Sequence, residues 1–181
     1  EPNTPAAMTV ALAGDDHDFD NTLYIAPHPR PQVNVLYLGN DEPNDTAGML
    51  YYLRQAFEAD NAAGARVIRH RAPETVDGGD VASAHMIVVA DTPEPQTIGL
   101  LRRHLEGGGM LLLVLRSAEA ATALSQLAGI DTLESREADV DRYAMLGRME
   151  LDHPLLNAFS DPRFGDFTRI HFWKYRCVDL T

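Results

Sequence analysis

Ser117 stands where an apolar run passes into a helical pattern, a position at which several enzyme families hold a nucleophile. The run belongs to the stretch EGGGMLLLVLRSAEAATAL, residues 106–124. A nucleophile elbow has small residues two positions before and after the nucleophile, because the tight turn crowds the flanking backbone. Leu115 and Glu119 are too large for those positions. The pattern therefore predicts that Ser117 is a helix N-cap, with Glu119 as an acid favoured in the first turn.

Polar residues also follow two other apolar runs, 33–38 and 86–90. The carboxylates of Asp41, Glu42 and Asp91 could bind Mg²⁺ there, although solvated loop acids are the commoner case in so acidic a chain. Ligands of open α/β sheets bind beyond the carboxyl ends of the strands. The candidate crevice residues at these ends are Asn40, Asp41, Asp91, Arg116 and Ser117.

Other site signatures are missing from the sequence. The loop at 39–45 has neither the G-x-G-x-x-G nor the G-x-x-x-x-G-K-[ST] spacing of dinucleotide and phosphate sites. The seven histidines show no His-x-His or His-x-x-x-His spacing, and Cys177 is the sole cysteine, so a metal site has no support. His153, beside Pro154, is typical of a turn rather than of a general base. We therefore predict no catalytic residue, no metal ion and no cofactor.

The charge of the chain argues against two classes of partner. It has 27 acidic and 15 basic residues, a net charge of −12, which opposes binding to nucleic acid and to anionic lipid. The longest apolar run, 110–115, is far shorter than the ~20 residues that span a bilayer, so we expect no membrane insertion by this chain. Because residue 1 is glutamate rather than methionine, we expect the chain to be part of a longer protein.

Strand and helix patterns alternate from residue 33 onward. The predicted strands are 33–38, 66–69, 86–90 and 110–115, with weaker ones at 143–150 and 168–175, and the predicted helices start at Asp45, 95 and 118. Continuously apolar strands between amphipathic helices indicate strands buried on both faces. The predicted fold class is therefore α/β, with a doubly wound, mostly parallel, flavodoxin-like sheet.

Capping and periodicity signals define the predicted helices in more detail. Asp45 is the predicted N-cap of the first helix, Gly107 the predicted C′ residue of the second, and Gly129 ends the third at residue 128. The expected inner faces are Leu50, Leu53 and Phe57 in the first helix and Ile98, Leu101 and Leu105 in the second, which spans 95–106.

The first 31 residues follow a different pattern. Residues 8–12 and 21–26 are predicted strands on either side of a Gly-Asp-Asp turn, and three prolines at 27, 29 and 31 stiffen an extended linker. Two short strands cannot bury a core by themselves. We interpret residues 1–31 as the end of a preceding β-domain with its proline-rich linker, and residues 32–181 as the α/β domain.

Aromatic residues gather near the end of the chain, in the stretch HFWKYR at 171–176. We interpret it as a strand with Phe172 on the core face. The alternative is a contact surface, because Trp, Tyr and Arg are the usual anchors of interfaces.

Several stretches together resemble a known family. They are DFDNTLYI at 18–25, VLYLG at 35–39, IVVAD at 87–91, LEGGGMLL at 105–112 and DHPL at 152–155. They resemble the class I glutamine-amidotransferase-like domain of membrane-anchored bacterial proteins of the aerotolerance (BatA-type) group, over roughly residues 15–176. In that group a membrane-spanning part and a β-sandwich region precede the domain. The resemblance implies the amidotransferase-like fold and a parent protein tethered to a membrane, with this domain on the periplasmic side.

The amidotransferase mechanism cannot be carried over with the resemblance. That family needs a cysteine at the elbow after the fourth strand, where this chain has Arg116 and Ser117. It also needs a His-x-Glu pair, whereas His153 is followed two residues later by Leu155. We therefore expect a non-enzymatic domain that acts in protein interaction or ligand sensing, through other domains of the same protein or through protein partners.

Two other functions remain open at this point. A receiver-like phosphoacceptor domain would use Asn40, Asp41, Asp91 and Ser117, although the late-strand lysine of that fold has no match. A small-molecule hydrolase would use Ser117 and needs a base within hydrogen-bond reach of it.

Overall fold

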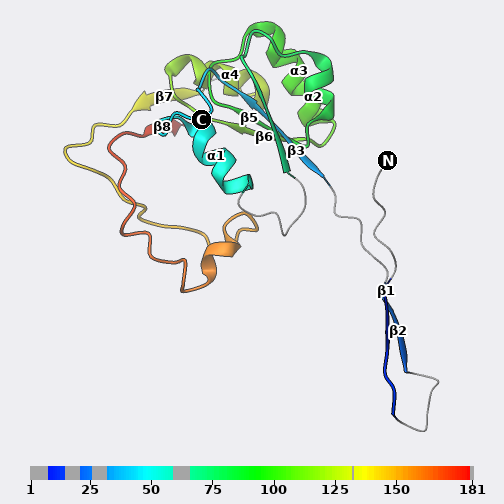
Figure 1. The fold of residues 1–181 in the computed structure, drawn as a ribbon. Helices are drawn as coiled ribbons and strands as arrows, with labels where there is room; N and C mark the ends of the chain where they lie inside the picture. The colour runs from blue at the N-terminus through cyan, green and yellow to red at the C-terminus, as the bar shows by residue number, and fades with distance from the viewer. Residues whose placement is uncertain (1–7, 15–20, 26–31, 59–65, 132, 180–181) are drawn as a thin grey trace.

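A four-stranded parallel sheet forms the centre of the computed structural model, which describes residues 8–14, 21–25, 32–58, 66–131 and 133–179 (Figure 1). The strands follow the order β4 (Arg66–Arg71), β3 (Val33–Leu38), β5 (Met86–Val89) and β6 (Met110–Leu113). The helices of the described part are α1 (Met49–Glu58), α2 (Gly78–Ser83), α3 (Pro95–Glu106) and α4 (Ala118–Ala128), with the short 3₁₀ helix η1 (Asn157–Ser160). Two antiparallel pairs stand apart from the sheet: β1 (Met8–Ala11) with β2 (Thr22–Ile25), and β7 (Glu134–Glu137) with β8 (Arg176–Asp179).

The strand order places a switch point between β3 and β5. β3 pairs in parallel with β4 on one side and with β5 on the other, so the chain moves first one way and then the other across the sheet. The crossovers then leave from neighbouring strand ends in opposite directions. A crevice opens at such a point outside the carboxyl ends of the strands. The α/β class and the parallel sheet predicted from the sequence are confirmed.

Two apolar layers hold the central strands, as their continuous hydrophobicity predicts. On one face, Leu36 and Leu38 of β3 and alternate residues of β5 pack with residues of α2, α3 and α4, including the fully buried Leu101. On the other face, Val35 and Tyr37 pack against α1 through Leu50, with Leu53 and Phe57 alongside. The predicted inner faces of both helices are confirmed. Each fully buried leucine contributes about 1.5–3 kcal/mol of transfer free energy.

β6 differs from the prediction of a strand buried on both faces. It pairs with β5 alone, and its side chains alternate in exposure, with Met110 53% and Leu112 47% exposed. Leu111 and Leu113 pack on the layer that α3 covers. Four helices therefore cover the sheet unequally, because α1 alone lies on the second face in the described part of the chain. β6 lies at the edge of the sheet, where α1 does not cover its second face. The hydrophobicity of a segment does not reveal whether its strand lies at an edge or in the centre.

The ends of α3 and α4 follow the sequence signals closely. Both helices have the predicted bounds, and Gly129 takes the left-handed conformation that ends α4. The predicted C′ role of Gly107 is wrong by one residue. Gly108 has the positive φ of 83°, its amide donates to Leu105, and the amide of Gly109 donates to His104. This pair of bonds is a Schellman motif, which needs its left-handed residue at Gly108.

The prediction that Asp45 caps the first helix is wrong as well. α1 starts at Met49, and Asp45 instead accepts a hydrogen bond from the Ala47 amide in the preceding loop. A helix absent from the prediction, α2, begins after Asp77, whose side chain accepts from the Asp80 amide. Two glycines at its start weaken the helical pattern in the sequence, because glycine is a poor helix former.

The predicted N-terminal hairpin is confirmed. β1 and β2 pair in antiparallel register, with Met8 opposite Ile25 and Val10 opposite Leu23. The hairpin lies well away from the parallel sheet (Figure 1). The proline-rich linker at 27–31 lies outside the described residues.

The late strands differ from the prediction. The extended ladder forms at β7 and β8, while the predicted segments 143–150 and 168–175 share a single bridge between Ala144 and Phe172. Phe172 is half-buried and lies outside both core layers, so its predicted place on the core face is wrong. No helix among the described residues is both long and apolar enough to cross a membrane.

Candidate functional site

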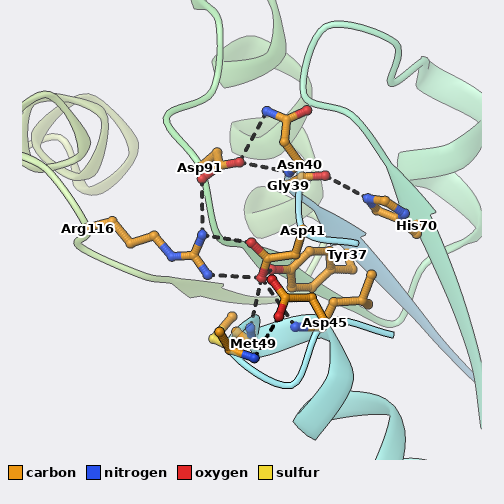
Figure 2. A network of polar contacts seen from close by, with 11 residues as sticks. Tyr37, Gly39, Asn40, Asp41, Asp45, Met49, His70, Asp91 and Arg116 are labelled. Atoms are coloured by element: carbon orange, nitrogen blue, oxygen red, sulfur yellow. Dashed lines mark hydrogen bonds and ion pairs between the residues drawn. The ribbon is translucent and has the colours of Figure 1, made fainter. Parts of the chain in front are cut away.

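Asp41 lies at the centre of the crevice, in the loop that follows β3 (Figure 2). Its Oδ2 accepts a hydrogen bond from the Tyr37 hydroxyl at 2.6 Å and from the amides of Met49 and Leu50 at 2.8 and 3.3 Å. These two amides are the first of α1, so the carboxylate satisfies donors that would otherwise have no partner in the helix. Asp41 therefore caps α1 from eight residues upstream.

Arg116 joins the loops that follow three strands. Its guanidinium donates to Oδ1 and Oδ2 of Asp41 at 3.0 Å each, and to Oδ1 of Asp91 at 3.3 Å. The side chain of Asp41 is 12% exposed, that of Asp91 29% and that of Arg116 39%. The two-pronged bond to Asp41 uses the planar geometry in which guanidinium and carboxylate match best.

Asn40 ties Asp91 to the end of β3. Its backbone amide donates to Oδ2 of Asp91 at 2.8 Å, and its side-chain amide donates to the same oxygen at 3.2 Å. Tyr37, Asn40, Asp41, Asp91 and Arg116 thus form one connected set, called the crevice network below (Figure 2). Four of the five predicted crevice residues belong to it.

Tyr37 is a member of the network that the sequence analysis missed. It lies in a continuous apolar run and is fully buried, so nothing local distinguishes it from a core residue. Gly39 is needed beside it, because a Cβ at that position would stand 2.8 Å from the Tyr37 ring. The carbonyl of Gly39 is bonded to Nε2 of His70 at 2.7 Å. The ring of His70 also meets that of Tyr37 edge to face, which fixes the base of the crevice.

The hydrogen bonds and charges within the network stabilise the ionised forms of Asp41 and Arg116. The hydrogen bonds from Arg116 hold the pKa of Asp41 well below its usual range, although burial acts in the opposite direction. Burial, together with the bond to Asp41, raises the pKa of Tyr37 above its usual range. The same ion pair raises the pKa of Arg116. Near neutral pH Asp41 is therefore a carboxylate, Arg116 a guanidinium cation and Tyr37 a neutral phenol.

The predicted magnesium alternative finds no support in this arrangement. All the bonds to Asp41 come from donors that compete with a cation for its oxygens, and Arg116 lies between the two carboxylates. Glu42 is exposed and is not part of the network. Among the described residues, no group of three or more His, Cys, Asp or Glu side chains is placed to hold a metal ion.

Ser117 is the fifth predicted crevice residue, and its N-cap role is confirmed. Its Oγ accepts from the Ala120 amide at 3.3 Å and lies 3.4 Å from Oγ1 of Thr92. A hydrogen bond from Ser117 also lowers the pKa of the exposed Glu119 carboxyl. The hydroxyl is thus engaged with its own helix, at Ala120 and Glu119, and with Thr92 in the loop after β5.

Four of the described histidines contact groups other than the Ser117 hydroxyl. His70 bonds Gly39, His85 accepts from the Asn34 amide, and His104 lies 3.3 Å from the Met110 carbonyl. His153 accepts from the Leu155 amide within a turn, as its neighbouring proline predicts. Cys177 lies on β8 opposite Arg136, in a sheet separate from the one that forms the crevice.

β8 is anchored to the crevice from outside. The guanidinium of Arg176 donates to the carbonyl of Arg116 at 3.3 Å and lies 3.9 Å from Glu137 of β7. A cavity of about 210 Å³ lies between the end of β6 and the start of β8. Sequence analysis missed this contact, because its partners are 60 residues apart.

Comparison of the chain with known protein families, curated proteins and solved structures found no match. What the chain does must therefore be inferred from the crevice and from the surfaces around it.

Proposed function

We propose that residues 32–181 form a non-catalytic, class I amidotransferase-like α/β domain of a larger membrane-anchored bacterial protein. The domain acts by contact with protein partners or by sensing a ligand. The flavodoxin-like assignment is supported by the strand order, in which the first strand lies between the second and the third. The assignment to a membrane-anchored protein of the aerotolerance group, with the domain on the periplasmic side, rests on the sequence resemblance.

The occupied crevice is the observation that carries this proposal. At the switch point, where an α/β enzyme holds its reacting groups, Arg116 bonds both carboxylates and Asp41 accepts from four different groups. Charged groups that are bonded to one another stabilise the loops, and Arg116 already occupies the position between the two carboxylates that a substrate or a metal ion would need. The network therefore serves to hold the three loops in one arrangement.

Activity assays on the native chain and on Ser117→Ala test most directly whether the domain is catalytic. We expect the purified chain to show no glutaminase and no esterase activity above the uncatalysed rate. Ser117→Ala should lower the free energy of unfolding by about 1 kcal/mol, because it removes the N-cap bond of α4. Ammonia release from glutamine, hydrolysis of p-nitrophenyl acetate and urea denaturation are the three measurements. An activity that Ser117→Ala abolishes while the fold survives would end the proposal.

A receiver-like phosphoacceptor domain is the second candidate, because Asp41 and Asp91 meet at the ends of β3 and β5. Arg116 opposes this function, since it occupies the space between the carboxylates that a divalent cation would need. Incubation with acetyl phosphate and Mg²⁺, followed by intact mass measurement, distinguishes the two candidates. An adduct of one phosphoryl group that Asp91→Asn removes would favour the receiver.

A further inference from the structure

An open groove lies in the long segment between β7 and β8. Residues 143–151 and 167–175 form two arms of the wide loop that connects these strands outside the parallel sheet (Figure 1). One cavity of about 340 Å³ and a second of about 330 Å³ share Met145, Leu146 and Gly147. The first also meets Leu151 and Phe167, and the second Phe172 and Tyr175. These two arms and their cavities are called the arm groove.

The backbone of one arm is open for pairing. Residues 145–150 contain no helix, turn or bend, and within the described chain the amides and carbonyls of residues 145–149 make no hydrogen bond. The neighbouring residue, Ala144, exchanges two backbone bonds with Phe172, at 2.8 and 2.9 Å. The arm thus begins at an isolated β-bridge and continues with unpaired backbone groups. An unpaired row of backbone amides and carbonyls is a template for an added strand.

The apolar side chains along the groove are too exposed for a surface without a partner. Met145 is 52% exposed, Leu146 45% and Tyr175 45%. Strand addition combines backbone bonds, which supply affinity, with pockets for alternate side chains, which supply specificity. The two cavities offer such pockets next to the same short stretch, Met145, Leu146 and Gly147.

The charge around the groove selects the kind of strand. Residues 142–176 carry six basic and four acidic residues, whereas the remainder of the chain carries nine basic and 23 acidic residues. Arg142 and Arg169 have no ion pair or hydrogen bond among the described residues. Arg148 lines the groove and has a 3.7 Å contact with the exposed Glu150. The groove is therefore the basic region of an acidic protein.

We propose that the arm groove binds an extended segment of a partner protein in which apolar side chains alternate with acidic ones. The segment adds as a strand to residues 145–149, places its apolar side chains in the two cavities and pairs its carboxylates with Arg148 and Arg169. A symmetric pair of copies of this chain would bring two basic arms together, which disfavours a second copy as the occupant. This inference rests on the proposed role in protein contact.

Fluorescence anisotropy with short peptides tests the charge preference. The probe is a labelled, blocked octapeptide of alternating valine and glutamate, and its counterpart has lysine in place of glutamate. We expect the acidic peptide to bind the full chain about tenfold more tightly than the basic one. Arg148→Glu combined with Arg169→Glu should weaken it by about tenfold. Arg103→Glu, a single charge reversal of the same kind on α3, should change the affinity by less than about twofold.

A second experiment tests whether the peptide forms backbone hydrogen bonds with residues 145–149. N-methylation of alternate amides on the pairing edge of the acidic peptide should abolish binding, because it removes the donors of the ladder. Gly147→Pro removes a donor from the chain itself and should have the same effect. Circular dichroism and thermal unfolding of this variant show whether the fold is kept. If it is not, the methylated peptide alone decides.

Several results would overturn the proposal. They are equal affinities for the acidic and basic peptides, a loss of affinity on Arg103→Glu as large as that of the double arginine variant, and unchanged binding of the methylated peptide. A dimer that the double arginine variant dissociates would assign the groove to a second copy, and preferential binding of an oligonucleotide would assign it to nucleic acid. None of these results concerns Ser117, so the failure of this inference is distinct from the appearance of an enzymatic activity.

Discussion

Asp41 combines two tasks that usually fall to separate residues. Its carboxylate caps the start of α1, and it also balances the charge of Arg116. Both tasks need the ionised form, so the folded state stabilises that form more than the unfolded chain does. The residue therefore links the stability of the crevice to pH.

Acidification should reveal this link. Because the folded-state pKa of Asp41 lies below its unfolded value, its contribution to stability is present above an aspartate pKa of about 4 and is lost as the pH falls toward the folded value. We expect the urea concentration at which half of the native chain is unfolded to decrease as the pH is lowered from about 4 to about 2. Asp41→Asn should be less stable at neutral pH and should lose less on acidification. Asp45→Asn is the matched control, since Asp45 bonds one loop amide.

Parallel pH dependence in the native chain and in Asp41→Asn would contradict the assignment. Other carboxylates with lowered pKa values, such as the exposed Asp161, act equally in both proteins. The difference between the two curves therefore isolates Asp41.

At the scale of elements, the end of α3 requires glycine because of its backbone conformation, whereas the interior of the helix does not. α3 ends in a Schellman motif that needs a left-handed residue at Gly108, while Gly99 lies inside the same helix with open space around it. The two glycines thus differ in what a side chain would cost. In the helix interior glycine is unfavourable relative to alanine, and at a positive φ the order reverses.

We expect opposite effects from the same substitution at these two positions. Gly99→Ala should raise the free energy of unfolding by about 0.5–1 kcal/mol, because alanine loses less conformational entropy in a helix. Gly108→Ala should lower it by about 1 kcal/mol, because the left-handed conformation strains an L side chain. Urea denaturation of both variants is the measurement. Stabilisation by Gly108→Ala would mean that the helix ends differently in solution.

At the scale of the whole molecule, the two faces of the sheet are unequally covered. α2, α3 and α4 contribute to the layer that contains Leu101, whereas α1 covers its face without reaching the outer part of β6. Leu101 is fully buried and Leu112 is 47% exposed. Two leucines that look alike in the sequence therefore contribute very differently to stability.

Truncation of each leucine should measure that difference. Leu101→Ala should cost about 2–5 kcal/mol, the usual range when a cavity is left in a packed core. Leu112→Ala should cost less than about 1 kcal/mol, because half of its surface already meets water. Guanidinium denaturation of both variants gives the comparison. A similar large cost at both positions would mean that another element covers the outer face of β6.

Local sequence signals predicted the parts of the fold that depend on near neighbours. The bounds of α3 and α4, the cap at Ser117 and the left-handed Gly129 depend on residues within a few positions of each other. Asp45 shows the limit of such signals. It has the right residue type and position for a cap, but Asp41 satisfies the start of α1 because the loop folds back on itself.

The set of crevice residues could be predicted because parallel strands end at one edge. Asn40, Asp41, Asp91 and Arg116 each follow a predicted strand, which is enough to bring them near one another. Their pairing could not be predicted. Asp41 and Arg116 are 75 residues apart, and the bonds between them depend on strand order and on the rotamer of a long side chain.

The amino-acid sequence by itself determined that this protein is an α/β chain with a parallel sheet, an N-terminal hairpin and polar residues at the strand ends. Hydrophobic periodicity and capping carry that information, because both act over a few residues. The tertiary structure alone decided that Tyr37 joins the polar network, that β6 lies at an edge and that the segments 143–150 and 168–175 pair at a single bridge instead of forming two strands. Those outcomes depend on which distant segments meet, and on which backbone groups find their partners there.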